Sequence, residues 1–221
     1  ETYRDMWGIE WRYVQDAYHN VVAPLATATT TDLDRYSWPD PYNAAMFTGL
    51  AERARHLYEN TGYVIAADAI KGGLLTTALQ IRGYEQFFMD TVLDEAFVNA
   101  LLDKLLWLYK EMWTSYLKVV GPYVQLVYFT DDIGAQKQML ISPNMFRTLF
   151  KPRLKALIDH IKGLADVKFM YHTDGTVNPV IDDIIDMGVD ILNPIQTSAG
   201  TMSDLHSLKK RHGSNIIFCG G

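Results

Sequence analysis

The chain has 221 residues, and a protein of this length buries about 70% of the surface that its extended chain exposes, so a sizeable core needs no disulfide. The composition, 48% hydrophobic and 21% charged, is that of a globular protein, and the net charge of −6 provides no basic surface for a nucleic acid. No apolar run approaches the length of about 18 residues that a membrane span needs, so we expect no membrane partner. The single cysteine, Cys219, excludes an internal disulfide and indicates a reducing, cytoplasmic location.

Residues 1–43 have no sustained helical periodicity, and we interpret them as an irregular lead-in. Aromatic residues alternate with polar ones between Trp7 and Tyr18, which is compatible with short strands or a hairpin. The sequence SWPDP at 37–41 predicts a rigid turn, because its two prolines fix φ and remove backbone donors.

The first regular elements follow from residue 43 onward. Met46, Leu50, Ala54 and Leu57 lie on one face of a helix that is predicted to end at Gly62. A short buried strand is expected over 64–67, and helices over 74–90 and 93–120. The last of these should end where Gly121-Pro122 prevents the helix from continuing.

The second half of the chain alternates apolar strands with capped helices. Strands are predicted over 124–129, 167–171, 189–193 and 215–219. Helices should begin at Ser142-Pro143, at Asn178-Pro179 and at Ser203, where capping residues and prolines favour a helix start.

This alternation predicts an α/β protein with a parallel sheet, either a doubly wound open sheet or a TIM (β/α)8 barrel. No glycine-rich phosphate-binding fingerprint follows a strand, and polar residues cluster after every strand, as they do at the mouth of a barrel. We therefore predict a TIM barrel that is incomplete here, with about five β/α units. Residues 1–221 would form a single domain, with the lead-in at 1–43 and β/α units at 44–221, as the central part of a longer barrel.

Two acidic motifs at strand ends are the main candidates for catalysis. His172 and Asp174 are two residues apart, so both side chains can reach one object, either as a metal half-site or as an acid/base pair. The alternative is that Asp174 caps a turn while His172 binds a carbonyl. Asp131 and Asp132 are adjacent carboxylates after an apolar strand, and at least one is expected to serve the site, because buried unpaired acids are costly. The alternative for this pair is helix capping together with an ion pair to Lys137.

Neutral amides and one further acid complete the predicted mouth. Asn193 and Gln196 suit the orientation of a substrate, and Asp68, at the end of the first strand, is assigned to substrate binding with them. The sequence KGG at 71–73 could leave backbone amides open to an anion. Cys219 is interpreted mainly as a small apolar filler.

An ordered set of motifs resembles the uroporphyrinogen decarboxylase-like superfamily over nearly the whole chain. The motifs are DMWG at 5–8, WPDP at 38–41, TDDIGAQ at 130–136, ISP at 141–143, FKPRL at 150–154, YHTDGT at 171–176, GVDILNPIQ at 188–196 and IFCGG at 217–221. The resemblance implies a TIM barrel of about 350 residues, of which this sequence would be an internal part. The superfamily contains uroporphyrinogen decarboxylases, which are lyases of porphyrin metabolism and need no cofactor, and corrinoid-linked methyltransferases.

The resemblance favours a corrinoid-dependent methyltransferase that moves a methyl group between a methylcorrinoid co-substrate and a small-molecule acceptor, with a corrinoid protein as partner. The methyltransferases bind Zn²⁺ through a His-x-Cys pair, and His172 matches the first ligand while Asp174 replaces the cysteine. We therefore expect His172 and Asp174 to hold a metal and to act with Asp131 and Asp132. The alternatives are tetrapyrrole decarboxylation, which the replacement of the decarboxylase's serine by Asp131 disfavours, and a non-catalytic subunit that binds a corrinoid or tetrapyrrole.

Overall fold

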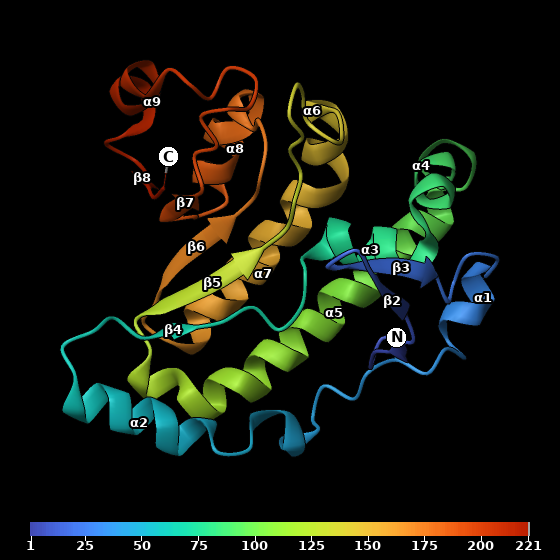
Figure 1. Cartoon of the computed structure of the whole chain (residues 1–221), viewed down its shortest axis with the longest axis horizontal. Helices are drawn as coiled ribbons and strands as arrows, with labels where there is room; N and C mark the ends of the chain where they lie inside the picture. Colours follow the sequence, from blue (N-terminus) through green and yellow to red (C-terminus); the bar gives the residue numbers. More distant parts are fainter. Residues whose placement is uncertain (221) are drawn as a thin grey trace.

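Two separate β-sheets organise the chain in a computed structural model that describes residues 1–220 (Figure 1). The first is antiparallel and contains β1 (Thr2–Arg4), β2 (Glu10–Val14) and β3 (Ala17–Val22). The second is parallel and contains β4 (Ala66–Ala67), β5 (Leu126–Thr130), β6 (Lys168–His172), β7 (Ile191–Asn193) and β8 (Ile217–Phe218).

The N-terminal sheet occupies the segment that the sequence indicated to be an irregular lead-in. The alternating aromatic residues form one of the predicted alternatives, a hairpin of β2 and β3 in which Tyr13 lies opposite Tyr18. A third strand, β1, pairs with β2 and places Tyr3 opposite Trp11. The hairpin turn lies at residues 15–16, both of which have positive φ. Residues 1–22 are therefore more regular than the composition indicated.

The five parallel strands confirm the predicted architecture. Their order in the sheet, β4-β5-β6-β7-β8, is their order in the sequence, and each lies within or one residue beyond its predicted range. All four neighbouring pairs are parallel, so the carboxyl ends of the strands lie along one edge. Within residues 1–220 the sheet does not close on itself, which agrees with the expectation of an incomplete barrel.

Helices cover one face of the parallel sheet (Figure 1). The longest is α5 (Glu95–Val120), which packs beside α7 (Lys151–Leu164). Phe129 of β5 lies in the core beneath them, in ring contact with Tyr109 of α5 and Tyr171 of β6. The remaining α-helices are α1 (Thr30–Leu33), α2 (Leu50–Asn60), α3 (Leu74–Arg82), α4 (Tyr84–Leu93), α6 (Pro143–Met145), α8 (Ile181–Asp186) and α9 (Leu205–His212).

Several helix boundaries differ from the sequence-based expectation. The helix predicted from residue 43 begins only at Leu50, because Gly49, with a φ of +77°, separates α2 from a 3-10 turn, Ala44–Phe47, that contains Met46. The helix predicted over 74–90 is two helices, because Gly83 adopts a φ of +91° and breaks it into α3 and α4. The last helix is capped by Asp204, whose side chain accepts from the amide of Ser207, and not by Ser203. The helix that begins at Ser142 contains a π-helical turn, Phe146–Phe150, between α6 and α7.

The second face of the sheet carries the residues that would face the interior of a closed barrel. In β5, Val127 and Phe129 are buried against the helices, so Tyr128 and Thr130 lie on the opposite face and are only partly buried. The register places Thr130 beside His172, and His172 beside Asn193. These three residues therefore form one row across β5, β6 and β7 at the carboxyl edge of the sheet.

Candidate active site at the carboxyl edge of the sheet

Asp132, His172 and Asp174 form a compact cluster of potential metal ligands at this edge. One ligand atom of each lies within 4.8 Å of the others. The amide of Asp174 donates to Oδ1 of Asp132 at 3.0 Å, which ties the loop after β6 to the loop after β5. The Nε2 atom of His172 lies 3.9 Å from Oδ2 of Asp174, close to the separation of about 3.4 Å expected for two ligands of a tetrahedral zinc ion.

The hydrogen bonds of Asn193 determine which nitrogen of His172 faces the cluster. The amide nitrogen of Asn193 donates to the carbonyl of Cys219 at 3.0 Å, so its oxygen points to Nδ1 of His172, 2.8 Å away. Because that oxygen can only accept, neutral His172 carries its proton on Nδ1. The lone pair is then on Nε2, the nitrogen that lies 3.9 Å from Oδ2 of Asp174, as in a histidine that binds metal through one nitrogen and donates a hydrogen bond through the other.

Asp131 does not lie in the cluster, which corrects the expectation that it would line one cavity with His172 and Asp174. Its carboxylate is buried and turned toward the N-terminus of α3, where it accepts from the amides of Leu75 at 3.1 Å and Thr76 at 2.9 Å and from the Thr76 hydroxyl at 3.0 Å. Burial outweighs these bonds and raises the pKa of Asp131 to about 6. Asp131 therefore caps a helix, as the alternative interpretation held, but that helix is α3, which lies earlier in the chain.

The contacts of Asp131 also argue against the anion site that the sequence suggested at residues 71–73. A Cβ atom on Gly73 would lie 2.3 Å from the side chain of Asp131, so this carboxylate already occupies the space in front of α3. The ammonium of Lys71 is paired with Asp5 at 3.0 Å. No room remains at this helix end for an external anion.

The other predicted substrate-binding residues lie along the same edge but differ in their roles. Asp68 is exposed after β4 and lines a pocket with Arg53 of α2 and Tyr116 of α5. Gln196 accepts from the amide of Gly175 at 2.7 Å and thereby supports the loop that carries Asp174. Cys219 is half-buried and contributes its backbone carbonyl to Asn193.

Two tyrosines at the site were missed by the sequence analysis. Burial raises the pKa of Tyr128, and the carboxylates of Asp68, Asp174 and Asp132 raise it further. Burial and the charge of Asp132 likewise raise the pKa of Tyr84, at the start of α4. The alternation within β5 could have identified Tyr128. Tyr84 is 44 residues or more from every other site residue except Asp68, so no local pattern pointed to it.

A close contact between two glycines holds the loops that carry the cluster. A Cβ atom on Gly134 would lie 2.4 Å from the carbonyl oxygen of Asp174, and one on Gly175 would lie 2.4 Å from the amide nitrogen of Ala135. Gly175 also has a φ of +82°, which side chains rarely adopt. The positions of Asp132 and Asp174 therefore depend on having glycine, which has no side chain, at positions 134 and 175.

The sequential parallel strands, with helices on one face and polar residues at the carboxyl edge, define part of a TIM-barrel-like fold. Comparison with protein families gives a match to the family described as Uroporphyrinogen decarboxylase (URO-D) over residues 3–220. The chain therefore belongs to this family, as the motifs indicated. No curated protein sequence matches the chain.

Among solved structures, a methyltransferase from Methanosarcina mazei is similar, with a TM-score of 0.60 and 18% sequence identity. The match covers 86% of this chain and 53% of the methyltransferase, so the chain spans about half the length of that protein. At this identity the similarity establishes the shared fold. Within residues 1–220, every helix is too short or too polar to cross a lipid bilayer.

Proposed function

We propose that this protein is a methyltransferase that moves a methyl group from a methylcorrinoid to a small acceptor, with the acceptor held at the Asp132, His172 and Asp174 cluster. The observation that carries the proposal is the convergence of these three donors at the carboxyl edge, with Nε2 of His172 3.9 Å from Oδ2 of Asp174. Membership of the URO-D family and the methyltransferase fold support it. In such a reaction the acceptor forms a bond to the methyl carbon while the cobalt–carbon bond breaks and its electron pair stays on cobalt.

The donor set is suited to a metal ion. Imidazole nitrogen and carboxylate oxygen are both donor types that Zn²⁺ accepts, and catalytic zinc sites use three protein ligands and keep a further position open. Replacement of sulfur by oxygen makes this site harder than a His-Cys site, so it binds soft metals less tightly. A bound Zn²⁺ would lower the pKa of an acceptor thiol. The chain's own contribution is to fix the His172 tautomer through Asn193 and to supply negative charge.

The charge of the edge disfavours the decarboxylase alternative. The residues that directly follow β4 to β7, at 68–69, 131–132, 173–174 and 194–196, include no lysine or arginine and three exposed aspartates, Asp68, Asp132 and Asp174. Uroporphyrinogen carries many carboxylates, and like charges repel it from such an edge. A cation or a neutral acceptor meets no such repulsion. Charge repulsion disfavours a non-catalytic corrinoid-binding subunit less strongly, because such a subunit needs no site for an acceptor.

Metal analysis of purified variants tests the proposal. We expect zinc to bind the wild type, to bind Asp174→Ala more than about 100-fold more weakly, and to bind Asp174→Cys at least as tightly as the wild type, because sulfur is restored. Asp166→Ala, which removes an exposed carboxylate just before the amino end of β6, is the matched control and should bind normally. Unchanged zinc affinity in Asp174→Ala would contradict the metal site.

Assays of turnover separate the three functions. Transfer of the methyl group from methylcobalamin to a thiol, followed by the change in the visible spectrum of the corrinoid, supports the methyltransferase. Release of carbon dioxide from uroporphyrinogen would instead establish the decarboxylase. Tight cobalamin binding without either activity would establish the binding subunit.

A further inference from the structure

A pocket lies apart from this cluster, between the N-terminal sheet and the loop that joins β4 to α3. Its volume is about 340 Å³, which is enough for a ligand of one or two rings. Its walls are Tyr3, Trp11 and Tyr18 from the three strands, and Ile70 and Lys71 from the loop. The pocket is therefore lined mainly by aromatic rings.

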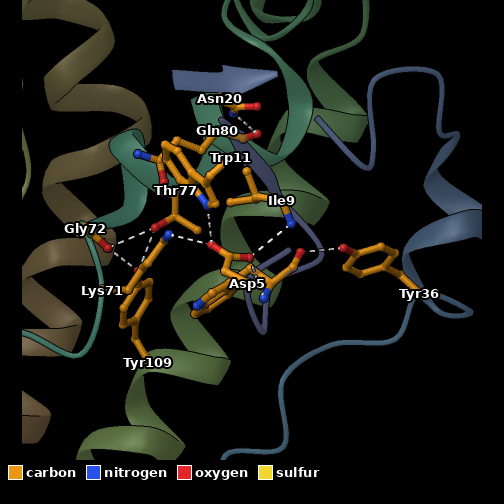
Figure 2. A network of polar contacts seen from close by, with 11 residues as sticks. Asp5, Ile9, Trp11, Asn20, Tyr36, Lys71, Gly72, Thr77, Gln80 and Tyr109 are labelled. Carbon is orange, nitrogen blue, oxygen red and sulfur yellow. Dashed lines mark hydrogen bonds and ion pairs between the residues drawn. The ribbon is translucent and has the colours of Figure 1, made fainter. Parts of the chain in front are cut away.

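The two charged residues of the pocket, Asp5 and Lys71, form an ion pair within a network of polar contacts (Figure 2). Asp5 accepts from the backbone amides of Trp7 and Ile9, from the indole nitrogen of Trp11 at 2.9 Å and from Lys71 at 3.0 Å. Burial alone would raise the pKa of Asp5, but the bonds from Trp11 and Lys71 outweigh it and hold the pKa below its usual value. Because the acid and the base neutralise each other, a ligand needs no net charge to bind here.

The aromatic walls hold their positions through contacts with one another. Tyr3 meets Tyr18 edge to face, with ring centroids 5.5 Å apart and planes at 89°, and Tyr13 contacts Tyr18 at 4.9 Å. Nevertheless, 47% of Tyr3 and 59% of Tyr18 remain exposed. Large rings that are ordered by their neighbours and still open to solvent offer a surface for stacking.

From this geometry we propose that the pocket binds a neutral, planar aromatic ring that carries a hydrogen-bond acceptor. The ring would stack against Tyr3 and Tyr18, because the Lys71 ammonium already lies over the Trp11 ring, 5.1 Å from its centroid. The acceptor would face that ammonium, which donates to Asp5 and has further donors. Lys71 directly precedes Gly72, whose backbone bridges Thr130 of β5. A ligand in this pocket would therefore lie along the same edge of the sheet as the acidic cluster, but on different residues, so the proposal does not depend on methyl transfer or on a metal.

Binding of 2-naphthol, measured by calorimetry, tests the proposal, with decahydro-2-naphthol as the comparison. The two compounds share a two-ring framework and a hydroxyl group, but only the first is planar and aromatic. We expect 2-naphthol to bind at least about tenfold more tightly, because aromatic contacts add to apolar burial. The double variant Tyr3→Leu/Tyr18→Leu should lose about tenfold in affinity for 2-naphthol.

Two control variants keep the test decisive. Tyr18→Phe keeps the ring and should retain affinity, and Tyr58→Leu removes an exposed tyrosine of α2 and should change nothing. Because Tyr3 and Tyr18 are exposed, the leucine variants should keep the wild-type circular dichroism spectrum. The nuclear magnetic resonance signal of the Trp11 indole N–H should shift on binding, since this ring lines the pocket. Equal affinity for both naphthols, undiminished binding to the double variant, or an unshifted Trp11 signal would overturn the proposal.

Discussion

Replacement of Gly175 by alanine should destabilise the protein through two separable effects. The φ of +82° makes an alanine strained by about 1–2 kcal/mol. The added Cβ would also lie 2.4 Å from the backbone nitrogen of Ala135, where an ordinary contact begins at 3.4 Å, so the two loops must separate by about 1 Å. Such overpacking costs about 1–3 kcal/mol. We therefore expect Gly175→Ala to lower the free energy of unfolding by about 2–5 kcal/mol.

Two other glycines isolate the two effects. Gly49 has a similar φ of +77° with no atom within 4 Å of an added Cβ, so Gly49→Ala should cost only the conformational part. A Cβ on Gly134 would meet the carbonyl oxygen of Asp174 at 2.4 Å but needs no positive φ, so Gly134→Ala should cost only the steric part. Urea unfolding of the three variants measures these costs. A Gly175→Ala variant no less stable than Gly49→Ala would refute the loop contact as a constraint on the site.

Three further substitutions test other parts of the structure. Asp5→Asn should lower the free energy of unfolding by about 1–3 kcal/mol at neutral pH. Because the pKa of Asp5 in the folded protein lies below the usual value of 3.8, the difference between wild type and variant should shrink as the pH falls below 3.8. Urea titrations across pH measure this difference, and a constant difference would contradict the prediction. Asn193→Leu should weaken zinc binding by about 10–100-fold by releasing the His172 tautomer, whereas Asn193→Asp should retain it, as calorimetry can show; equal affinities of these two variants would argue against the tautomer. Arg82→Met should cost about 3–5 kcal/mol in chemical unfolding, because it leaves the buried Asp90 without its cationic partner at 2.6 Å and with a hydrogen bond from Gln86. A cost below about 1 kcal/mol would exclude the Arg82–Asp90 pair as a stabilising contact.

The strands of the parallel sheet were predictable because their signals are local. Each is a short apolar run that ends in polar residues, and capping residues or prolines mark most of the intervening helices. The break at Gly83 was harder to recognise, since a glycine within a helical pattern is often tolerated. Only the φ of +91° shows that the chain turns there.

The site was only partly predictable because its assignments depend on long-range contacts. His172 and Asp174 lie together as their spacing on a strand indicated. The division of roles between Asp131 and Asp132 was not visible, since Asp131 reaches Leu75, 56 residues earlier in the chain. The position of α3 decides which of the two adjacent acids turns outward. The sequence around Asp131 and Asp132 does not indicate that position.

The carboxylate of Asp131 in front of α3 also determines what the amino end of this helix can bind. In many α/β proteins the first helix after a strand presents its free amides to a phosphate group. Here two of those amides bind the chain's own carboxylate, so the place where a nucleotide or sugar phosphate would be gripped is closed from within. A phosphate ester bound along the described part of this edge would therefore need contacts other than the Leu75 and Thr76 amides at the amino end of α3.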